Sequence, residues 1–103
     1  MTLRVNFDDL ENKGTDSGGD IIYYYNGSPF TGIIEEYING VLVGESEFTD
    51  GHRGGGQRDY YPNGQLAEEY YIHFNKLEGS YKRWDESGSL ISQSTYLQGN
   101  KIS

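Results

Sequence analysis

The chain contains no cysteine, and among its 103 residues it has only two prolines, one tryptophan and one methionine. The absence of cysteine excludes disulfide bonds and thiolate metal sites. Long apolar runs are also missing, and the first ten residues include Asp8 and Asp9, so the sequence predicts neither a membrane span nor a signal peptide. We therefore expect a soluble, cytoplasmic protein of a single domain.

Basic side chains are scarce as well. Eight Lys and Arg stand against sixteen Asp and Glu, which gives a formal net charge of −8. Residues 1–54 hold ten acidic and three basic side chains (−7), whereas residues 55–103 hold six and five (−1). A negative field repels phosphate backbones and anionic lipids and favours basic partners, so we expect no binding to nucleic acid or membranes. A surface charged only for solubility is the alternative explanation.

Glycine and tyrosine, in contrast, are abundant, with 15 and 10 residues, and they recur in a pattern. Three segments share a glycine, an aromatic residue five positions later, a second glycine, a leucine two residues beyond it, and a large apolar residue six further on. The segments begin at Gly32, Gly56 and Gly79, which gives periods of 24 and 23. An internal repeat of this length indicates that one supersecondary unit is stacked several times.

Each unit has the pattern of a β-hairpin, because Asn-Gly or Ser-Gly turns separate two short strands. We predict an all-β fold, an antiparallel meander of such hairpins in one elongated, curved sheet. The units span about 32–55, 56–78 and 79–102 within a repeat domain of residues 20–103. The predicted strands lie near 20–25, 32–38, 41–48, 57–61, 66–74, 79–84 and 90–96.

Alternation within the second strand of each unit predicts the buried face. Leu42 and Phe48 share one side of their strand, and Leu66 and Ile72 share the equivalent side of the next. We expect this face to be the core side and Leu66 to be buried.

The first 19 residues depart from the repeat and are predicted to form a short strand followed by a polar loop. Leu3–Phe7 alternates like a strand that pairs with one end of the sheet, and residues 11–20 are polar and rich in glycine. Residues 51–56, with four glycines, are predicted to be the most mobile turn between repeats.

The sequences Tyr61-Pro-Asn-Gly-Gln-Leu66, Gly79-Ser-Tyr-Lys-Arg-Trp84 and Pro29-Phe-Thr-Gly32 resemble the variant MORN repeats of bacterial proteins often described as antitoxin components. The similarity covers roughly residues 22–101. It implies a curved sheet of hairpins with a scaffolding or recognition role, of which neutralising a toxin is the favoured example. No catalytic residue is implied, and membrane association is not expected because the chain lacks a basic patch.

Motifs that carry chemistry are weak in this sequence. Asp16-Ser17-Gly18-Gly19 is similar to a serine-protease nucleophile segment, but His52 and His73 are distant in sequence and the chain is too short for that scaffold. Asn12, Asp16 and Asp20 do not fit a calcium loop, and residues 51–56 lack the lysine of a phosphate loop. We therefore expect no catalytic residues, no cofactor and no metal.

Partner binding is the remaining function, and two sets of residues are candidates for it. The first is an acidic stripe of Glu35, Glu45, Glu47, Glu68 and Glu69. Within it, Glu35, Glu45 and Glu47 are the candidate docking residues for a basic protein partner such as a toxin. The second is a ladder of aromatic residues at equivalent repeat positions, namely Tyr37, Tyr61 and Trp84. The alternative is a structural scaffold that forms homo-oligomers through exposed sheet edges.

Overall fold

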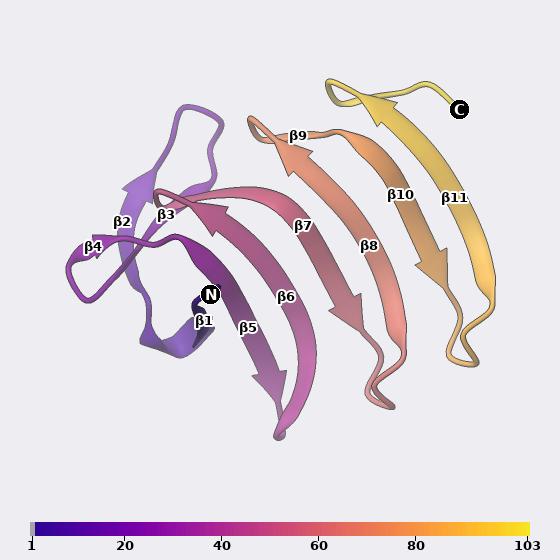
Figure 1. Cartoon of the computed structure of the whole chain (residues 1–103), viewed down its shortest axis with the longest axis horizontal. Coiled ribbons are helices and arrows are strands. Elements are labelled where there is room, and N and C mark those ends of the chain that lie inside the picture. The colour runs from indigo at the N-terminus through magenta and orange to yellow at the C-terminus, as the bar shows by residue number, and fades with distance from the viewer. Residues whose placement is uncertain (1) are drawn as a thin grey trace.

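A computed structural model describes residues 2–103, which form two β-sheets (Figure 1). In the larger sheet the strand order is β1-β5-β6-β7-β8-β10-β11-β12, with β9 paired to β8, and the smaller sheet has the order β2-β3-β4. The strands are β1 (Arg4–Asn6), β2 (Glu11–Thr15), β3 (Ile21–Tyr25), β4 (Ser28–Pro29), β5 (Gly32–Ile38), β6 (Val41–Thr49), β7 (His52–Tyr60), β8 (Leu66–His73), β9 (Lys76–Leu77), β10 (Gly79–Trp84), β11 (Leu90–Leu97) and β12 (Asn100–Lys101). One 3-10 turn, η1 (Phe7–Asp9), follows β1.

The predicted all-β meander is confirmed. From β5 to β8 each strand pairs antiparallel with the next, and β10 and β11 continue the sheet beyond β8. Figure 1 shows these strands side by side in a curved array, with the small sheet at the β5 end and the C-terminus at the β11 end. The strand predicted over 20–25 is β3, and it belongs to the smaller sheet.

Every repeat hairpin contains a shift of register near the end of its first strand. The shifts lie between Glu36 and Tyr37, between Asp59 and Tyr60, and between Arg83 and Trp84. Such β-bulges place two residues of one strand opposite one of its partner and reverse the alternation of faces beyond them.

The turns of the three hairpins are of two kinds. At Asn39 and Gly40 both φ angles are positive, +51° and +79°, as the predicted Asn-Gly turn requires. In the second hairpin only Gly64 has a positive φ, and its N–H donates to the carbonyl of Tyr61 at 2.9 Å. The third hairpin repeats this arrangement, since the N–H of Gly88 donates to Asp85 at 3.0 Å.

Strand β1 pairs with β5 in parallel, with Arg4 opposite Ile33. The prediction of a strand at one end of the sheet is therefore confirmed for Arg4–Asn6, whereas Phe7 begins the 3-10 turn. Gly32 makes this pairing possible, because its φ is +150° and a Cβ there would lie 2.2 Å from the carbonyl oxygen of Leu3.

Residues 11–20 are not wholly a loop, so this prediction is wrong for its first half. Residues Glu11–Thr15 form β2, which pairs antiparallel with β3. All five residues of β2 are exposed. A polar composition is compatible with an edge strand of this kind, because the neighbouring strand supplies the apolar contacts.

Residues 51–56 are not a mobile turn either. The β6–β7 turn is confined to Asp50 and Gly51, and β7 runs through Gly54, Gly55 and Gly56. Gly55 has a φ of +95°, and a Cβ on it would lie 2.3 Å from a carboxylate oxygen of Glu47. The glycines thus provide room beside a neighbouring strand.

The apolar core lies where the small sheet covers the first hairpin. Val5, Phe30, Ile34 and Phe48 are buried there, and Leu10, Tyr23 and Tyr25 pack against them. Beyond β7 the sheet is a single layer, and Ile72 is the one further buried apolar side chain among residues 2–103. The predicted core side is confirmed at Phe48 and Ile72, but Leu66 is only half-buried because no second layer covers it.

Candidate functional site

The face of the large sheet that carries Phe48 and Ile72 also carries three tyrosines, and we call it the tyrosine face. The rings of Tyr70 (β8) and Tyr81 (β10) are stacked, with centroids 5.0 Å apart and planes inclined by 12°. The ring of Tyr96 (β11) continues the row, with its centroid 6.0 Å from that of Tyr81. These rings lie on strands that the small sheet does not cover, so they form a continuous aromatic surface.

A row of carboxylates runs beside the tyrosines on the same face. Register places Glu36 opposite Gly44, Gly44 opposite Asp59, and Asp59 opposite Glu68. Because Gly44 has no side chain, the row is open between Glu36 and Asp59. We call these three carboxylates the acidic row; the phenol of Tyr81 donates a hydrogen bond to its member Glu68.

Two members of the acidic row, Asp59 and Glu68, have a pKa above the ordinary value of their side chains. Desolvation on the sheet raises the pKa of Asp59. Desolvation raises the pKa of Glu68 as well, and the negative charge of Asp59 adds to this effect, while Arg83 opposes it. Both carboxylates would therefore gain from a further cation placed against them.

The predicted acidic stripe is divided between the two faces, because Glu68 belongs to the acidic row. The other members, Glu35, Glu45, Glu47 and Glu69, lie on the opposite face and have partners within the molecule. Glu45 is buried, with 8% of its surface exposed, where it pairs with Arg4 and accepts a hydrogen bond from Tyr60. Glu35 pairs with the same guanidinium at 2.9 Å, and Glu47 accepts a hydrogen bond from the N–H of Gly56. Glu45 is thus wrongly predicted to be a surface residue, because the sequence does not show that β1 brings Arg4 beside it.

The predicted aromatic ladder is not formed by the residues proposed for it. Among residues 2–103 the rings of Tyr37, Tyr61 and Trp84 make no stacked or edge-to-face pair with one another. Tyr37 is 45% exposed at the end of β5, and the hydroxyl of Tyr61 donates to the carbonyl of Trp84 at 2.8 Å.

The bulges explain this difference. In each hairpin the aromatic residue after the register shift lies opposite the repeat leucine: Tyr37 opposes Leu42, Tyr60 opposes Leu66, and Trp84 opposes Leu90. In the second repeat the residue that is structurally equivalent to Tyr37 and Trp84 is therefore Tyr60 and not Tyr61. Alignment on the bulges also equates Ile34, Gln57 and Tyr81. The position of the bulge is therefore the signal that would have located Tyr81 on the tyrosine face. Aligning the repeats on their first glycine instead shifts the second unit by one residue relative to the other two.

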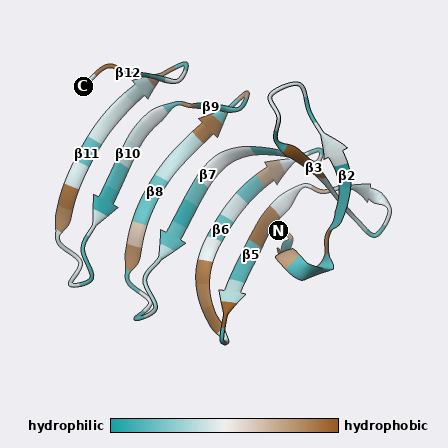
Figure 2. Cartoon of the chain, turned by 180° about the vertical axis from the view of Figure 1, so that it is seen from behind, coloured by the Kyte–Doolittle hydropathy of each residue, from teal (hydrophilic) through white to brown (hydrophobic). Residues whose placement is uncertain are grey.

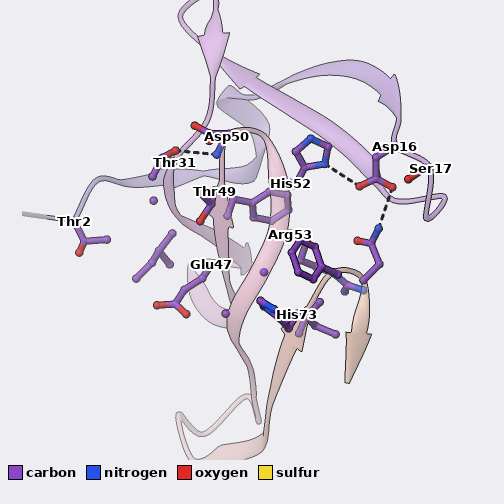
Figure 3. A pocket seen from close by; sticks show the side chains of 18 residues that line it. Thr2, Asp16, Ser17, Thr31, Glu47, Thr49, Asp50, His52, Arg53 and His73 are labelled. Carbon is purple, nitrogen blue, oxygen red and sulfur yellow. Dashed lines mark hydrogen bonds and ion pairs between the residues drawn. The ribbon is translucent and has the colours of Figure 1, made fainter. Parts of the chain in front are cut away.

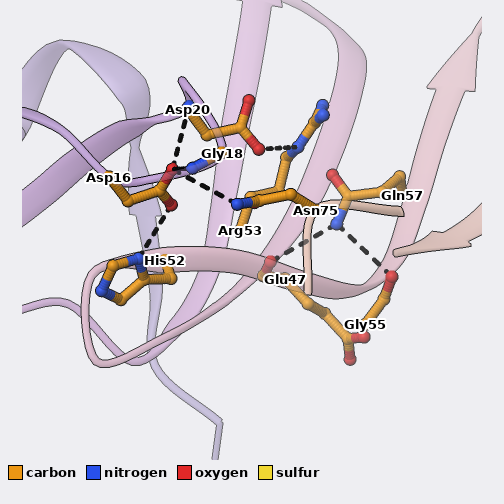
Figure 4. Close-up of polar contacts among 9 residues, drawn as sticks. All are labelled: Asp16, Gly18, Asp20, Glu47, His52, Arg53, Gly55, Gln57 and Asn75. Carbon is orange, nitrogen blue, oxygen red and sulfur yellow. Dashed lines mark hydrogen bonds and ion pairs between the residues drawn. The ribbon is translucent and has the colours of Figure 1, made fainter. Parts of the chain in front are cut away.

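A hollow of about 850 Å³ lies at the end of the sheet where the β6–β7 and β8–β9 turns meet the loop between β2 and β3 (Figure 3). His52 Nδ1 lies 2.9 Å from a carboxylate oxygen of Asp16, and Asn75 donates to the other oxygen at 3.3 Å (Figure 4). That second oxygen also accepts the N–H groups of Gly18 and Asp20 at 2.9 and 3.1 Å. The hydrogen bond to His52, followed by the smaller contributions of Asp20, Asn75 and Gly18, lowers the pKa of Asp16 despite some desolvation.

The hollow brings together Asp16, Ser17, His52 and His73, which are separate in sequence. Within residues 2–103 no hydrogen bond joins Ser17 to either histidine, so the hydroxyl is not aligned with a base as a nucleophile requires. In the same range no group of three His, Asp or Glu side chains gathers at metal-binding distance. The contacts of Asp16 instead attach the β2–β3 loop to two turns of the large sheet.

Two segments of the chain, residues 54–73 and 77–98, match the MORN repeat variant family. They correspond to the β7–β8 and β10–β11 hairpins, which confirms the predicted MORN repeats over this part of the chain. No curated protein and no solved structure matches the sequence. MORN repeats are in general modules that bind proteins or membranes. Across residues 2–103 the structure contains no helix with the length and apolar character of a membrane span.

Proposed function

We propose that the protein is a non-enzymatic recognition module that binds a basic segment of a protein partner on its tyrosine face. Antitoxin or immunity proteins that neutralise a basic toxin are the proposed functional class. The observation that carries the proposal is the acidic row beside the stacked rings of Tyr70 and Tyr81. Among residues 2–103 no cation lies within ion-pair distance of Asp59, the central carboxylate of that row.

An arginine or lysine side chain fits this surface by two kinds of contact. A guanidinium stacks on an aromatic ring, and it pairs with a carboxylate through two parallel hydrogen bonds. Tyr70 and Asp59 offer both on neighbouring strands, because Tyr70 opposes Gln57 and Glu68 opposes Asp59 in the register of β7 with β8.

Binding of a cation is also linked to protons. The pKa values of Asp59 and Glu68 are raised in the free protein, and a bound cation would lower both. The complex would therefore form with release of protons in the acidic range, and its affinity would increase as the pH rises through that range.

A test uses a short arginine-rich peptide as the probe, titrated against the protein by calorimetry. We expect the Asp59→Asn, Glu68→Gln double variant to bind the peptide at least ten times more weakly, as loss of about 1.4 kcal/mol or more implies. Glu35→Gln removes a carboxylate from the opposite face and serves as the control, with unchanged affinity. Equal binding by the double variant, or no binding of the peptide to the wild type, would contradict the proposal.

A scaffold is the second candidate function, and one specific observation favours it. The last long strand of the sheet, β11, has an edge that is only partly covered.

A further inference from the structure

Most edge strands of the two sheets carry a feature that discourages further pairing. Strand β1 has only three residues, β4 contains Pro29, and β2 carries Glu11 and Lys13. Short length, proline and charge are the usual protections of a sheet edge. Strand β11 differs in length and charge, because it has eight residues and neither a proline nor a charged side chain, and its bulge, at Ile91, lies near its start.

Only the last part of β11 is covered on its outer side. Strand β12 pairs with Tyr96 and Leu97, and the following residues exchange hydrogen bonds with Thr95, whose N–H donates to Ser103 at 3.2 Å and whose carbonyl accepts from Ile102 at 2.8 Å. Residues 90–94 have no backbone partner on this side within residues 2–103. Because the outward groups alternate along a strand, Gln93 directs its N–H and C=O away from the sheet, as Thr95 does.

The side chains of this edge are uncharged, and two of them are apolar and exposed. Residues 87–100 contain no Asp, Glu, Lys or Arg, although such residues make up 23% of the chain. Leu90 and Ile91 are 49% and 57% exposed, and Figure 2 shows them as an apolar segment at the start of β11. Exposed apolar side chains next to unpaired backbone groups favour the addition of another strand.

The distribution of charge indicates that the added strand comes from a second copy of the chain. Residues 1–54 carry a net charge of −7 and residues 55–103 only −1. Two copies that meet at β11 approach through their nearly neutral halves and keep their acidic halves at opposite ends, which minimises repulsion. A basic partner, in contrast, would find no charge to attract it to this strand.

We infer that the protein forms a two-fold symmetric dimer in which residues 90–94 of β11 pair antiparallel with the same residues of a second copy. With the axis at Ser92, Gln93 of each copy lies opposite Ile91 of the other, and Leu90 of each copy lies opposite Ser94 of the other. The interface closes on itself. It does not extend into a filament, because β12 covers the rest of β11 and β1 occupies the edge of β5.

The absence of cysteine allows a direct test by cross-linking. Facing residues of an antiparallel pair that are not hydrogen-bonded have Cα atoms about 4.5 Å apart, within the range that a disulfide spans. We expect Ser92→Cys to form a disulfide-linked dimer under mild oxidation. Ser28→Cys, on the edge of the smaller sheet, serves as the control and should remain largely monomeric. Cross-linking of Ser92→Cys no faster than Ser28→Cys would overturn the inference.

Sedimentation of the unmodified chain over a concentration series provides an independent readout. We expect wild type to pass from monomer to dimer, and Gln93→Lys to raise the dimer dissociation constant at least tenfold while Ser28→Lys leaves it unchanged. Wild type that stays monomeric up to about 1 mM, a weak-binding limit of about −4.1 kcal/mol, would overturn the inference. Far-UV circular dichroism of each variant verifies that it is folded. The side chain of Gln93 lies on the face opposite to Tyr96, so failure of the sedimentation test is distinguishable from failure of the proposed function.

Discussion

Arg4 and Glu45 form an ion pair between the first strand of the chain and the centre of β6, across 41 positions of sequence. The guanidinium is half-exposed, with 42% of the side chain accessible, whereas the carboxylate is buried. Tyr60 donates a hydrogen bond to the same carboxylate from β7. The pair therefore connects the parallel β1–β5 edge to the antiparallel repeats.

Replacing Arg4 by Ala should destabilise the protein, because the buried carboxylate of Glu45 loses the guanidinium with which it is paired. We expect the free energy of unfolding to fall by about 1–3 kcal/mol, less than for a fully buried pair because Arg4 is partly exposed. Urea unfolding followed by circular dichroism measures the change. Glu35→Gln is the control: it removes the more exposed partner of the same guanidinium and should change stability by about 0.5 kcal/mol or less. Equal stability of Arg4→Ala and wild type would show that Glu45 is solvated in another way.

Truncation of two apolar side chains should have unequal effects. Phe30 is 1% exposed in the core, and Phe30→Ala should cost about 3–5 kcal/mol, whereas Leu66→Ala should cost about 1–2 kcal/mol since Leu66 is half-buried in a single layer. Chemical unfolding of both variants gives the comparison. A larger loss for Leu66→Ala than for Phe30→Ala would mean that the second repeat, and not the covered first hairpin, contains the main core.

The contacts of Asp16 predict a dependence of stability on acid pH. Because the pKa of Asp16 is lowered below 3.8 in the folded state, its contribution is present above that value and is lost as the pH falls through the folded pKa. Asp16→Asn should therefore be less stable than wild type near neutral pH, and the difference should diminish as the pH falls below 3.8. Unfolding curves over a pH series from neutral to acid test this. Asp9→Asn removes an equal charge from the exposed η1 turn and should show no such difference. A difference for Asp16→Asn that persists in acid would assign it to the shape of the side chain and not to its charge.

Two tyrosines, Tyr70 and Tyr23, should ionise above the ordinary range of a phenol in the folded protein. Desolvation raises the pKa of Tyr70 and of Tyr23 above the ordinary value of 10.0. At Tyr70 the guanidinium of Arg53 opposes this effect while Asp59 and Glu68 add to it, and at Tyr23 the carboxylate of Glu36 adds to it. Since the folded state favours the protonated phenol, ionisation of both groups above pH 10 should promote unfolding. An alkaline titration followed by phenolate absorbance measures this. Tyr70→Phe should remove part of the late absorbance, which appears above pH 10. A late component that is unchanged in Tyr70→Phe would place Tyr70 in a more solvated environment.

Local patterns were sufficient to predict the strands of the repeat domain, because turn chemistry and alternation act over a few residues. Asn39-Gly40 adopts the two positive φ angles that its residue types favour, and β5 has the predicted bounds of residues 32–38. The predicted inner face is likewise confirmed at Phe48 and Ile72, one repeat apart.

Features that depend on single-residue shifts or on distant segments were not accessible in the same way. The bulge before Tyr60 lies one residue earlier than the glycine spacing suggests, so the wrong tyrosine was equated with Tyr37 and Trp84. Nothing in the neighbourhood of Glu45 indicates that Arg4 lies beside it, because a parallel strand pair leaves no turn signature. The acidic row has the same origin: Glu36, Asp59 and Glu68 become neighbours only through the register of four strands.

The parallel pairing of β1 with β5 has a consequence for the order in which the molecule folds. Contacts among β5, β6, β7 and β8 are made between consecutive segments, so these hairpins close small loops and form early. Arg4 must instead find Ile33 across an intervening three-stranded unit. Strand β1, which is synthesised before β5, is thus among the last of the described strands to dock. Until it does, the carboxylate of Glu45 and the apolar side of Phe48 are left to the solvent, and this interval is when the newly made chain is most exposed to proteases and to aggregation.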